Sequence, residues 1–137
     1  MEKISYAKTV YGRDEIEAVV RCLNNSTQMG PNARAFEKKI AELFSKRFCL
    51  YLNSGSSALF VGLESFNFPE GSEVITPALT FSTTVGSIVK NKLIPTFVDV
   101  DINTYCIESY QIEEMINNKT VAILAPNLLG NLPNWSH

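Results

Sequence analysis

Short apolar segments alternate with helical ones between residues 73 and 125, and this alternation constrains the fold more than any other feature of the sequence. The pattern predicts strands at 73–76, 95–100 and 120–125, separated by helices at 82–91 and 109–116. Strands that are apolar throughout are typical of sheets covered on both faces. Strands joined through helices pair in parallel with right-handed crossovers. The sequence therefore predicts an α/β fold with a mainly parallel sheet and flanking helices.

Two helices are predicted ahead of this alternating region. Apolar residues at helical spacing favour a helix over 13–24 and a second one that carries its apolar face at 36–44. The apolar run 48–52 is interpreted as a buried strand, and 56–66 as the helix that follows it. We therefore predict a helical N-terminal segment at 1–47 and one α/β unit at 48–137.

Composition and charge exclude several classes of protein. With 45% hydrophobic and 10% aromatic residues, the chain can bury a core, which excludes intrinsic disorder. Its 12 cationic and 14 anionic side chains argue against a nucleic-acid partner. The first residues lack the apolar core of a signal peptide, and no apolar run reaches the roughly 20 residues of a membrane span. Three cysteines without a C-x-x-C pair are interpreted as buried thiols, so we expect a cytoplasmic protein without a membrane partner.

The segment Asn53–Ala58 is the strongest local candidate for a binding site. It joins the predicted strand 48–52 to the next helix, and Gly55 permits close backbone approach. Ser56 and Ser57 place hydroxyl and amide N–H groups at the positive end of that helix, where a phosphate can bind. The alternative is that Ser56 only caps the helix. Neither a G-x-G-x-x-G fingerprint nor a Walker A lysine is present, so the two standard nucleotide-binding loops are not supported.

Two further candidates follow predicted strands. Phe81 comes just after the carboxyl end of a strand, where its ring can either stack on a flat heterocycle or belong to the core.

Asp99 and Asp101, with Asn103, suggest either a metal-binding D-x-D turn or a polar turn closed by local hydrogen bonds. We favour the polar turn. His137 is the only histidine, so a Ser-His-Asp triad and a histidine-based metal site are excluded. No metal site is predicted.

Together these features resemble the sugar-aminotransferase family of fold-type-I pyridoxal-phosphate (PLP) enzymes, the DegT/DnrJ/StrS type. The matching stretches occur in the family's order and spacing along nearly the whole chain: Thr27–Pro31 with Phe36-Glu37, Asn53–Leu59, Gly71–Phe81, and Pro95–Asp101 with Thr104-Tyr105 and Ile107. Each stretch alone is only weakly specific for the family, but four stretches in the same order and with matching spacings are specific for it. The resemblance implies a three-layer PLP-dependent transferase large domain of fold type I, incomplete here, with the C-terminal domain absent.

The resemblance also implies roles for individual residues. Ser56 and Ser57 would hold the PLP phosphate, and Phe81 would stack on the pyridine ring. Asn127 falls where the family often has His or Asn near the cofactor. Gly30-Pro31 is expected near the sugar site. The family's pyridine aspartate and its Schiff-base lysine match no residue here, so we expect no catalytic residue in this chain.

For the intact enzyme, the resemblance implies PLP-dependent transfer of an amine from an amino-acid donor to a keto group of a nucleotide-linked deoxysugar, in lipopolysaccharide or surface-polysaccharide biosynthesis. Two alternatives stay open. One is a sugar 3-dehydrase, which carries His in place of the lysine and removes a hydroxyl; three stretches resemble that branch, namely Phe81–Val85, Asp101–Thr104 and Asn127–Asn131. The other is a non-catalytic, truncated α/β module that binds a phosphate-bearing ligand or a partner chain. The resemblance further implies a homodimer, and we expect this chain alone to be inactive.

Overall fold

The fold is given by a computed structural model that describes residues 4–5, 8–25, 27–28 and 30–137. Met29 of the stretch Thr27–Pro31 lies outside the described residues, as do residues 1–3 and 6 near the start of the chain. The chain divides into two compact units, Met1–Tyr51 and Leu52–His137.

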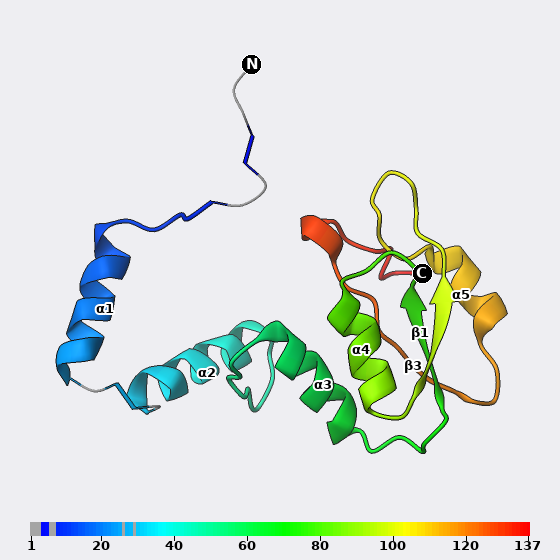
Figure 1. Cartoon of the computed structure of the whole chain (residues 1–137), viewed down its shortest axis with the longest axis horizontal. Coiled ribbons are helices and arrows are strands. Elements are labelled where there is room, and N and C mark those ends of the chain that lie inside the picture. Colours follow the sequence, from blue (N-terminus) through cyan, green and yellow to red (C-terminus); the bar gives the residue numbers. More distant parts are fainter. Residues whose placement is uncertain (1–3, 6–7, 26, 29) are drawn as a thin grey trace. The chain divides into compact units, whose positions relative to one another are not determined.

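The first unit contains two helices, α1 (Arg13–Asn25) and α2 (Pro31–Leu43), as the apolar spacing predicts (Figure 1). Asp14 and Glu15 lie in the first turn of α1, where their negative charge stabilises the helix by interacting with the positive end of its dipole. α2 begins with a proline, whose fixed φ and missing N–H suit the first helical position. The apolar residues that predict α1 are all exposed: Ile16, Val19, Val20 and Leu23.

Three parallel strands form the sheet of the second unit: β1 (Glu73–Pro77), β2 (Ile94–Val98) and β3 (Thr120–Ile123). Their order is β2-β1-β3, with β1 at the centre. Three helices accompany them: α3 (Gly55–Ser65) before β1, α4 (Ser82–Lys90) between β1 and β2, and α5 (Ser109–Met115) between β2 and β3. The predicted order of strands and helices and their parallel pairing are confirmed, with small shifts at the ends of elements.

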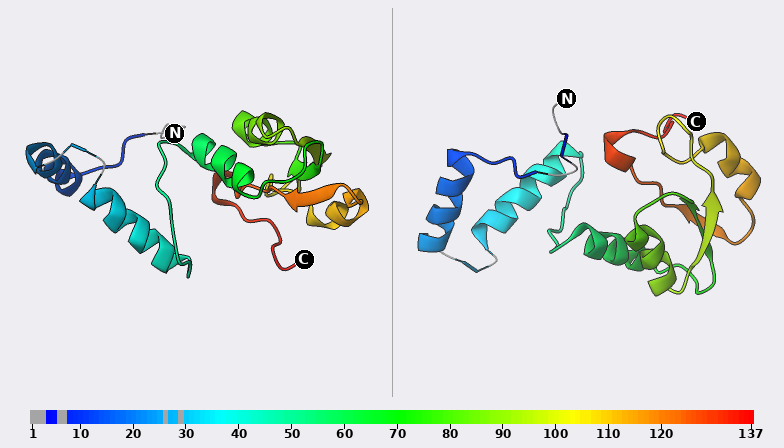
Figure 2. Two further views of the ribbon diagram at one scale, coloured as in Figure 1. Left: turned by 90° about the horizontal axis from the view of Figure 1, so that it is seen from below. Right: turned by 45° about the horizontal axis from the view of Figure 1, so that its top comes forward.

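The sheet is covered on both faces, as the apolar character of its strands predicts. Val74 of β1 is fully buried in a cluster with Leu63 of α3 and Ile88 of α4. The next residue, Ile75, is fully buried in a separate cluster, against which Ile112 of α5 packs. Successive side chains of a strand point to opposite faces, so α3 and α4 cover one face and α5 covers the other. Figure 2 shows α4 and α5 on opposite sides of the strands, which is the predicted three-layer arrangement.

The predicted strand at 48–52 is wrong. Residues 48–54 form no strand, and Phe48 and Leu50 are 77% and 69% exposed. A strand needs a neighbour that accepts and donates its backbone hydrogen bonds, but here the Tyr51 N–H donates to Glu37 Oε1 of α2 at 2.8 Å. The Tyr51 ring also meets Phe36 of α2 edge to face, with 5.6 Å between ring centroids. The end of this segment is therefore attached to α2 within the first unit.

The prediction of buried thiols holds for one cysteine of three. Cys106 is 2% exposed, whereas Cys22 and Cys49 are partly exposed. Among the helices of the described residues, none is both long enough and apolar enough to cross a membrane.

Candidate functional site

The amino end of α3 is capped by Ser54, and not by Ser56 as the alternative interpretation had it. Ser54 lies in extended backbone immediately before the helix, and its Oγ accepts the Ser57 N–H at 3.1 Å. A cap is the residue that precedes the helix, and the helix begins at Gly55, so Ser56 already lies inside the first turn. The Ser56 side chain is therefore not used in capping.

Four polar groups are available at this helix end. The backbone bonds of α3 start with the Ala58 N–H to the Ser54 carbonyl at 3.0 Å. The N–H groups of Gly55 and Ser56 precede that bond, so the helix itself offers them no acceptor. The hydroxyls of Ser56 and Ser57 lie beside them. Ser57 Oγ accepts from Ser54 Oγ at 3.1 Å and keeps its own proton, whereas Ser56 Oγ donates to Thr83 Oγ1 and must turn its proton to bind an anion. A Cβ placed on Gly55 would meet nothing within 4 Å, so the space beside it is open.

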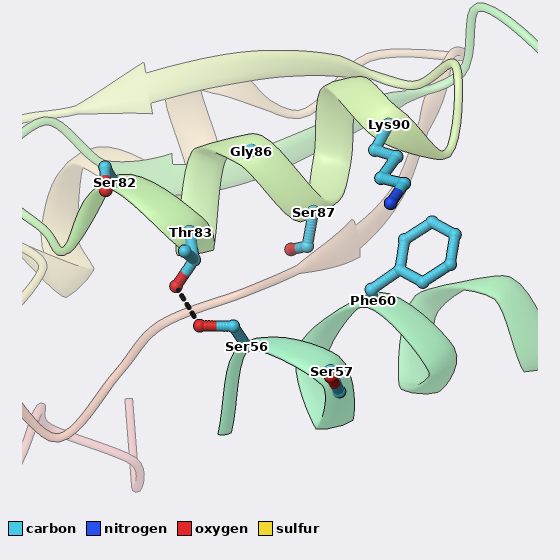
Figure 3. Close-up of a pocket in the computed structure, with 8 residues that line it drawn as sticks. All are labelled: Ser56, Ser57, Phe60, Ser82, Thr83, Gly86, Ser87 and Lys90. Carbon is cyan, nitrogen blue, oxygen red and sulfur yellow. Dashed lines mark hydrogen bonds between the residues drawn. The ribbon is translucent and has the colours of Figure 1, made fainter. Parts of the chain in front are cut away.

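A cavity of about 350 Å³ lies between α3 and α4, and Figure 3 shows the side chains around it. It is lined by Ser56, Ser57, Phe60, Ser82, Thr83, Gly86, Ser87 and Lys90. Ser56 Oγ lies 3.0 Å from Thr83 Oγ1, which joins the two helices by a hydroxyl–hydroxyl hydrogen bond. At the other end of the cavity, Lys90 Nζ lies 4.6 Å from the centre of the Phe60 ring. The cavity thus has one end rich in hydroxyls and one end closed by a cation over an aromatic ring.

Phe81 and Asn127 lie at the carboxyl edge of the sheet. Phe81 immediately precedes α4, and its side chain is 68% exposed, so the alternative that it belongs to the core is wrong. Asn127 follows β3, the strand next to β1, and its Oδ1 accepts the Trp135 Nε1–H at 3.2 Å. Within the described residues neither side chain lines the cavity at Ser56. The structure therefore brings Ser56 and Ser57 together and leaves Phe81 and Asn127 outside that cavity.

Gly30 and Pro31 belong to the first unit, at the start of α2. Gly30 immediately precedes the helix in extended backbone, and Pro31 is its first residue. Gly30 also lines a cavity of about 590 Å³ inside this unit, together with residues that include Phe36 and Tyr51. Their predicted place near a sugar site stays a prediction.

The Asp99–Asp101 turn is closed by local hydrogen bonds. Asp101 Oδ1 accepts the N–H groups of Thr104 at 2.8 Å and Asn103 at 3.0 Å. These bonds, the one from Thr104 first, lower the pKa of the Asp101 carboxyl below its ordinary value because they stabilise the ionised form. No group of three or more His, Cys, Asp or Glu side chains placed to hold a metal ion occurs in the described part of the chain. The polar-turn interpretation accounts for this segment.

Residues 10–137 match the DegT/DnrJ/EryC1/StrS aminotransferase family. The chain belongs to this family. The family is PLP-dependent, and its members include nucleotide-sugar aminotransferases and 3-dehydratases of polysaccharide biosynthesis. The fold described above therefore corresponds to part of the fold-type-I domain of these PLP-dependent proteins.

Three relatives illustrate the range of this family. The chain is 39% identical over 136 residues to the lipopolysaccharide biosynthesis protein RfbH of Salmonella typhimurium. This alignment covers 93% of the chain and 31% of that protein. It is 32% identical over 129 residues to a 3-oxo-glucose-6-phosphate:glutamate aminotransferase of Bacillus subtilis, covering 90% of this chain and 29% of that enzyme. The structure of a GDP-4-keto-6-deoxymannose-3-dehydratase with a trapped PLP–glutamate geminal diamine superposes with a TM-score of 0.90 at 30% identity, over 98% of this chain and 36% of that one. The chain spans about a third of the length of these relatives.

The donors at the amino end of α3 fit the phosphate of the family's cofactor. A phosphate needs several hydrogen-bond donors and a positive potential, and a helix amino end supplies both. Ser56 and Ser57 add their hydroxyls to the two N–H groups that the helix leaves unused. No acidic side chain lines the adjoining cavity, so none there opposes an anion.

Sequence reasoning missed two residues of this site, Ser54 and Thr83. The cap at Ser54 has a local signal, because Ser is a preferred capping residue and a glycine opens the helix directly after it. Thr83 has no local sequence signal, because it is 27 residues from its partner Ser56 and contacts it only through the packing of α3 against α4.

Proposed function

We propose that this chain supplies the phosphate-binding part of a PLP site in an enzyme that acts on a nucleotide-linked keto sugar. The supporting observation is the set of donors at the amino end of α3, in a chain that belongs to a PLP-dependent family. Ser56 and Ser57 donate their hydroxyl protons to the cofactor phosphate, and the unused N–H groups of Gly55 and Ser56 donate beside them.

We propose roles for the remaining predicted residues as well. Phe81 offers the face of an exposed ring to the flat pyridine of the cofactor. Asn127 offers an amide at the same edge of the sheet, and Gly30 and Pro31 border the sugar. When bound, PLP supplies an electron sink for bonds at an amine-bearing carbon. We assign no catalytic residue to this chain.

The substrates that we propose follow the relatives. An amino acid such as glutamate supplies the amine, and a keto group of a nucleotide-linked deoxysugar accepts it. The product serves lipopolysaccharide or other surface-polysaccharide synthesis, with the reaction in the cytoplasm and the enzyme acting as a homodimer. The match to the protein RfbH supports a role in lipopolysaccharide synthesis, the match to the glutamate aminotransferase supports glutamate as the amine donor, and a match to a GDP-perosamine synthase supports a nucleotide-linked sugar.

A 3-dehydratase is the second candidate. The GDP-4-keto-6-deoxymannose-3-dehydratase structure superposes over 98% of this chain, and it contains a trapped PLP–glutamate geminal diamine. The same phosphate site would serve either reaction, because the cofactor is the same. The two candidates differ in whether an amine is delivered to the sugar or a hydroxyl is removed from it.

The proposal predicts that binding depends on the phosphate group. Pyridoxamine 5′-phosphate is the suitable probe, because it carries the ring and the phosphate but lacks the aldehyde that reacts with any exposed lysine. In isothermal titration calorimetry of the 137-residue chain, we expect it to bind on the order of 10⁴-fold more tightly than pyridoxamine, since each of the four charge-assisted hydrogen bonds to the phosphate contributes about 1.5 kcal/mol or more. Equal affinity for the two compounds, or no binding of either, would contradict the proposal.

A further inference from the structure

We infer that Thr83 is a positioning residue, whose hydroxyl directs the proton of Ser56 toward the cofactor phosphate. The inference rests on the proposed function, because it concerns how Ser56 is presented to that phosphate. The geometry behind it is the 3.0 Å contact between Ser56 Oγ and Thr83 Oγ1 (Figure 3).

The proton count makes this contact informative. A serine hydroxyl has one proton to donate and two lone pairs that accept. In the structure Ser56 Oγ donates to Thr83 Oγ1, so its proton is used and its oxygen presents only lone pairs to an anion. If Thr83 donates to Ser56, the Ser56 proton is free for the phosphate. An anion at the end of α3 therefore favours the second arrangement, in which a chain of hydroxyls runs from Thr83 through Ser56 to the phosphate.

Such a chain strengthens the terminal hydrogen bond. A hydroxyl that accepts one hydrogen bond becomes a better donor of the next, because the two bonds polarise each other. Ser56 is exposed, so without Thr83 its side chain would have to lose rotamer freedom when the phosphate binds. With Thr83 in place, that side chain is already held.

The position of Thr83 is fixed by the packing of α4. Thr83 lies in the first turn of this helix, next to Thr84, which is 2% exposed. Further along the helix, Ile88 is fully buried in the cluster that also contains Leu63 of α3. The two helices that carry Ser56 and Thr83 therefore share one core, and the distance between their hydroxyls is set by that core.

A second hydroxyl pair in the same region provides a control. Thr80 Oγ1 and Thr84 Oγ1 lie 3.1 Å apart, just ahead of and within the same helix. Neither residue lines the cavity or contacts Ser56 among the described residues. Thr80→Val removes a hydroxyl of the same kind without touching the chain of hydroxyls that leads to the phosphate.

The test measures the affinity of the chain for pyridoxamine 5′-phosphate by calorimetry in a double-mutant cycle. We expect Thr83→Val to weaken binding by about 3- to 10-fold, the effect of losing one hydrogen bond. Thr83→Ser keeps the hydroxyl and is expected to bind like the wild type, as is Thr80→Val. In a Ser56→Ala background, Thr83→Val is expected to have no further effect, because its partner is already absent. Circular dichroism of each variant reports folding, and Thr83→Ala replaces Thr83→Val if the latter does not fold.

The outcomes separate this inference from the function on which it rests. If the wild type binds the phosphate ester no better than pyridoxamine, both the proposed function and the inference fail. If the wild type discriminates but Thr83→Val binds as tightly, the function stands and the inference is overturned. The inference is also overturned if Thr83→Ser fails to restore binding, or if Thr83→Val weakens the Ser56→Ala variant as much as it weakens the wild type.

Discussion

Replacing Ile75 by alanine is expected to destabilise the second unit by about 2–5 kcal/mol, a large part of the about 5–15 kcal/mol that holds a typical domain folded. Ile75 is fully buried in the central strand β1, where it pairs with Thr96 of β2 and Ile123 of β3. Truncating its side chain removes contacts with the cluster beneath α5 and leaves a cavity that the sheet cannot collapse to fill. Urea denaturation followed by far-ultraviolet circular dichroism measures the change.

Ile102→Ala is the matched control for Ile75→Ala. Ile102 is 78% exposed in the turn after β2, so its truncation is expected to change the free energy of unfolding by less than about 0.5 kcal/mol. Equal effects of the two substitutions would contradict the assignment of β1 to the centre of the core.

The double substitution Ser56→Ala/Ser57→Ala is expected to weaken binding of pyridoxamine 5′-phosphate on the order of 100-fold, because two charge-assisted hydrogen bonds of about 1.5–3 kcal/mol are lost together. Affinity for pyridoxamine, which lacks the phosphate, is expected to stay the same. Ser54 is kept in this variant, so its Oγ still accepts the N–H of residue 57 and the cap remains, although the hydrogen bond that Ser54 Oγ donates to Ser57 Oγ is lost. Calorimetric titration of both compounds against the variant and the wild type gives the comparison.

Ser65→Ala is the control on the same helix. Ser65 is the last residue of α3, and its Oγ donates to the Gly62 carbonyl at 2.7 Å, far along the helix from the phosphate site. Its substitution is expected to leave both affinities unchanged. If Ser65→Ala weakened binding as much as the double variant does, the loss would reflect the stability of α3 and not contacts to the phosphate.

The sequence predicted what depends on local patterns. Periods of hydrophobicity and turn residues determine strands and helices, so β1, β2, β3 and the helices between them were predictable from the chain. The place of Ser56 and Ser57 at a helix amino end was predictable for the same reason, because a turn followed by small hydroxyl residues and an apolar helix is recognisable without knowledge of what surrounds it.

What depends on distant parts of the chain was not predictable. Residues 48–52 are as apolar as a strand, but periodicity does not say whether a neighbouring strand is available, and Tyr51 bonds to Glu37 of α2. The partner of Ser56 was likewise hidden, because Thr83 reaches it only after α4 has packed beside α3. The exposure of Phe81 also follows from packing, since its place after a strand allows both a buried and an open ring.

The location of the phosphate is tested most directly by the backbone amide NMR spectrum of the chain during titration with pyridoxamine 5′-phosphate. We predict that the amide signals of Gly55 and Ser56 shift and saturate together with the phosphorus signal of the ligand, and that pyridoxamine does not move them. Saturable binding that shifts amides elsewhere in the chain but leaves those of residues 54–58 unchanged would contradict the assignment of the amino end of α3 as the phosphate site.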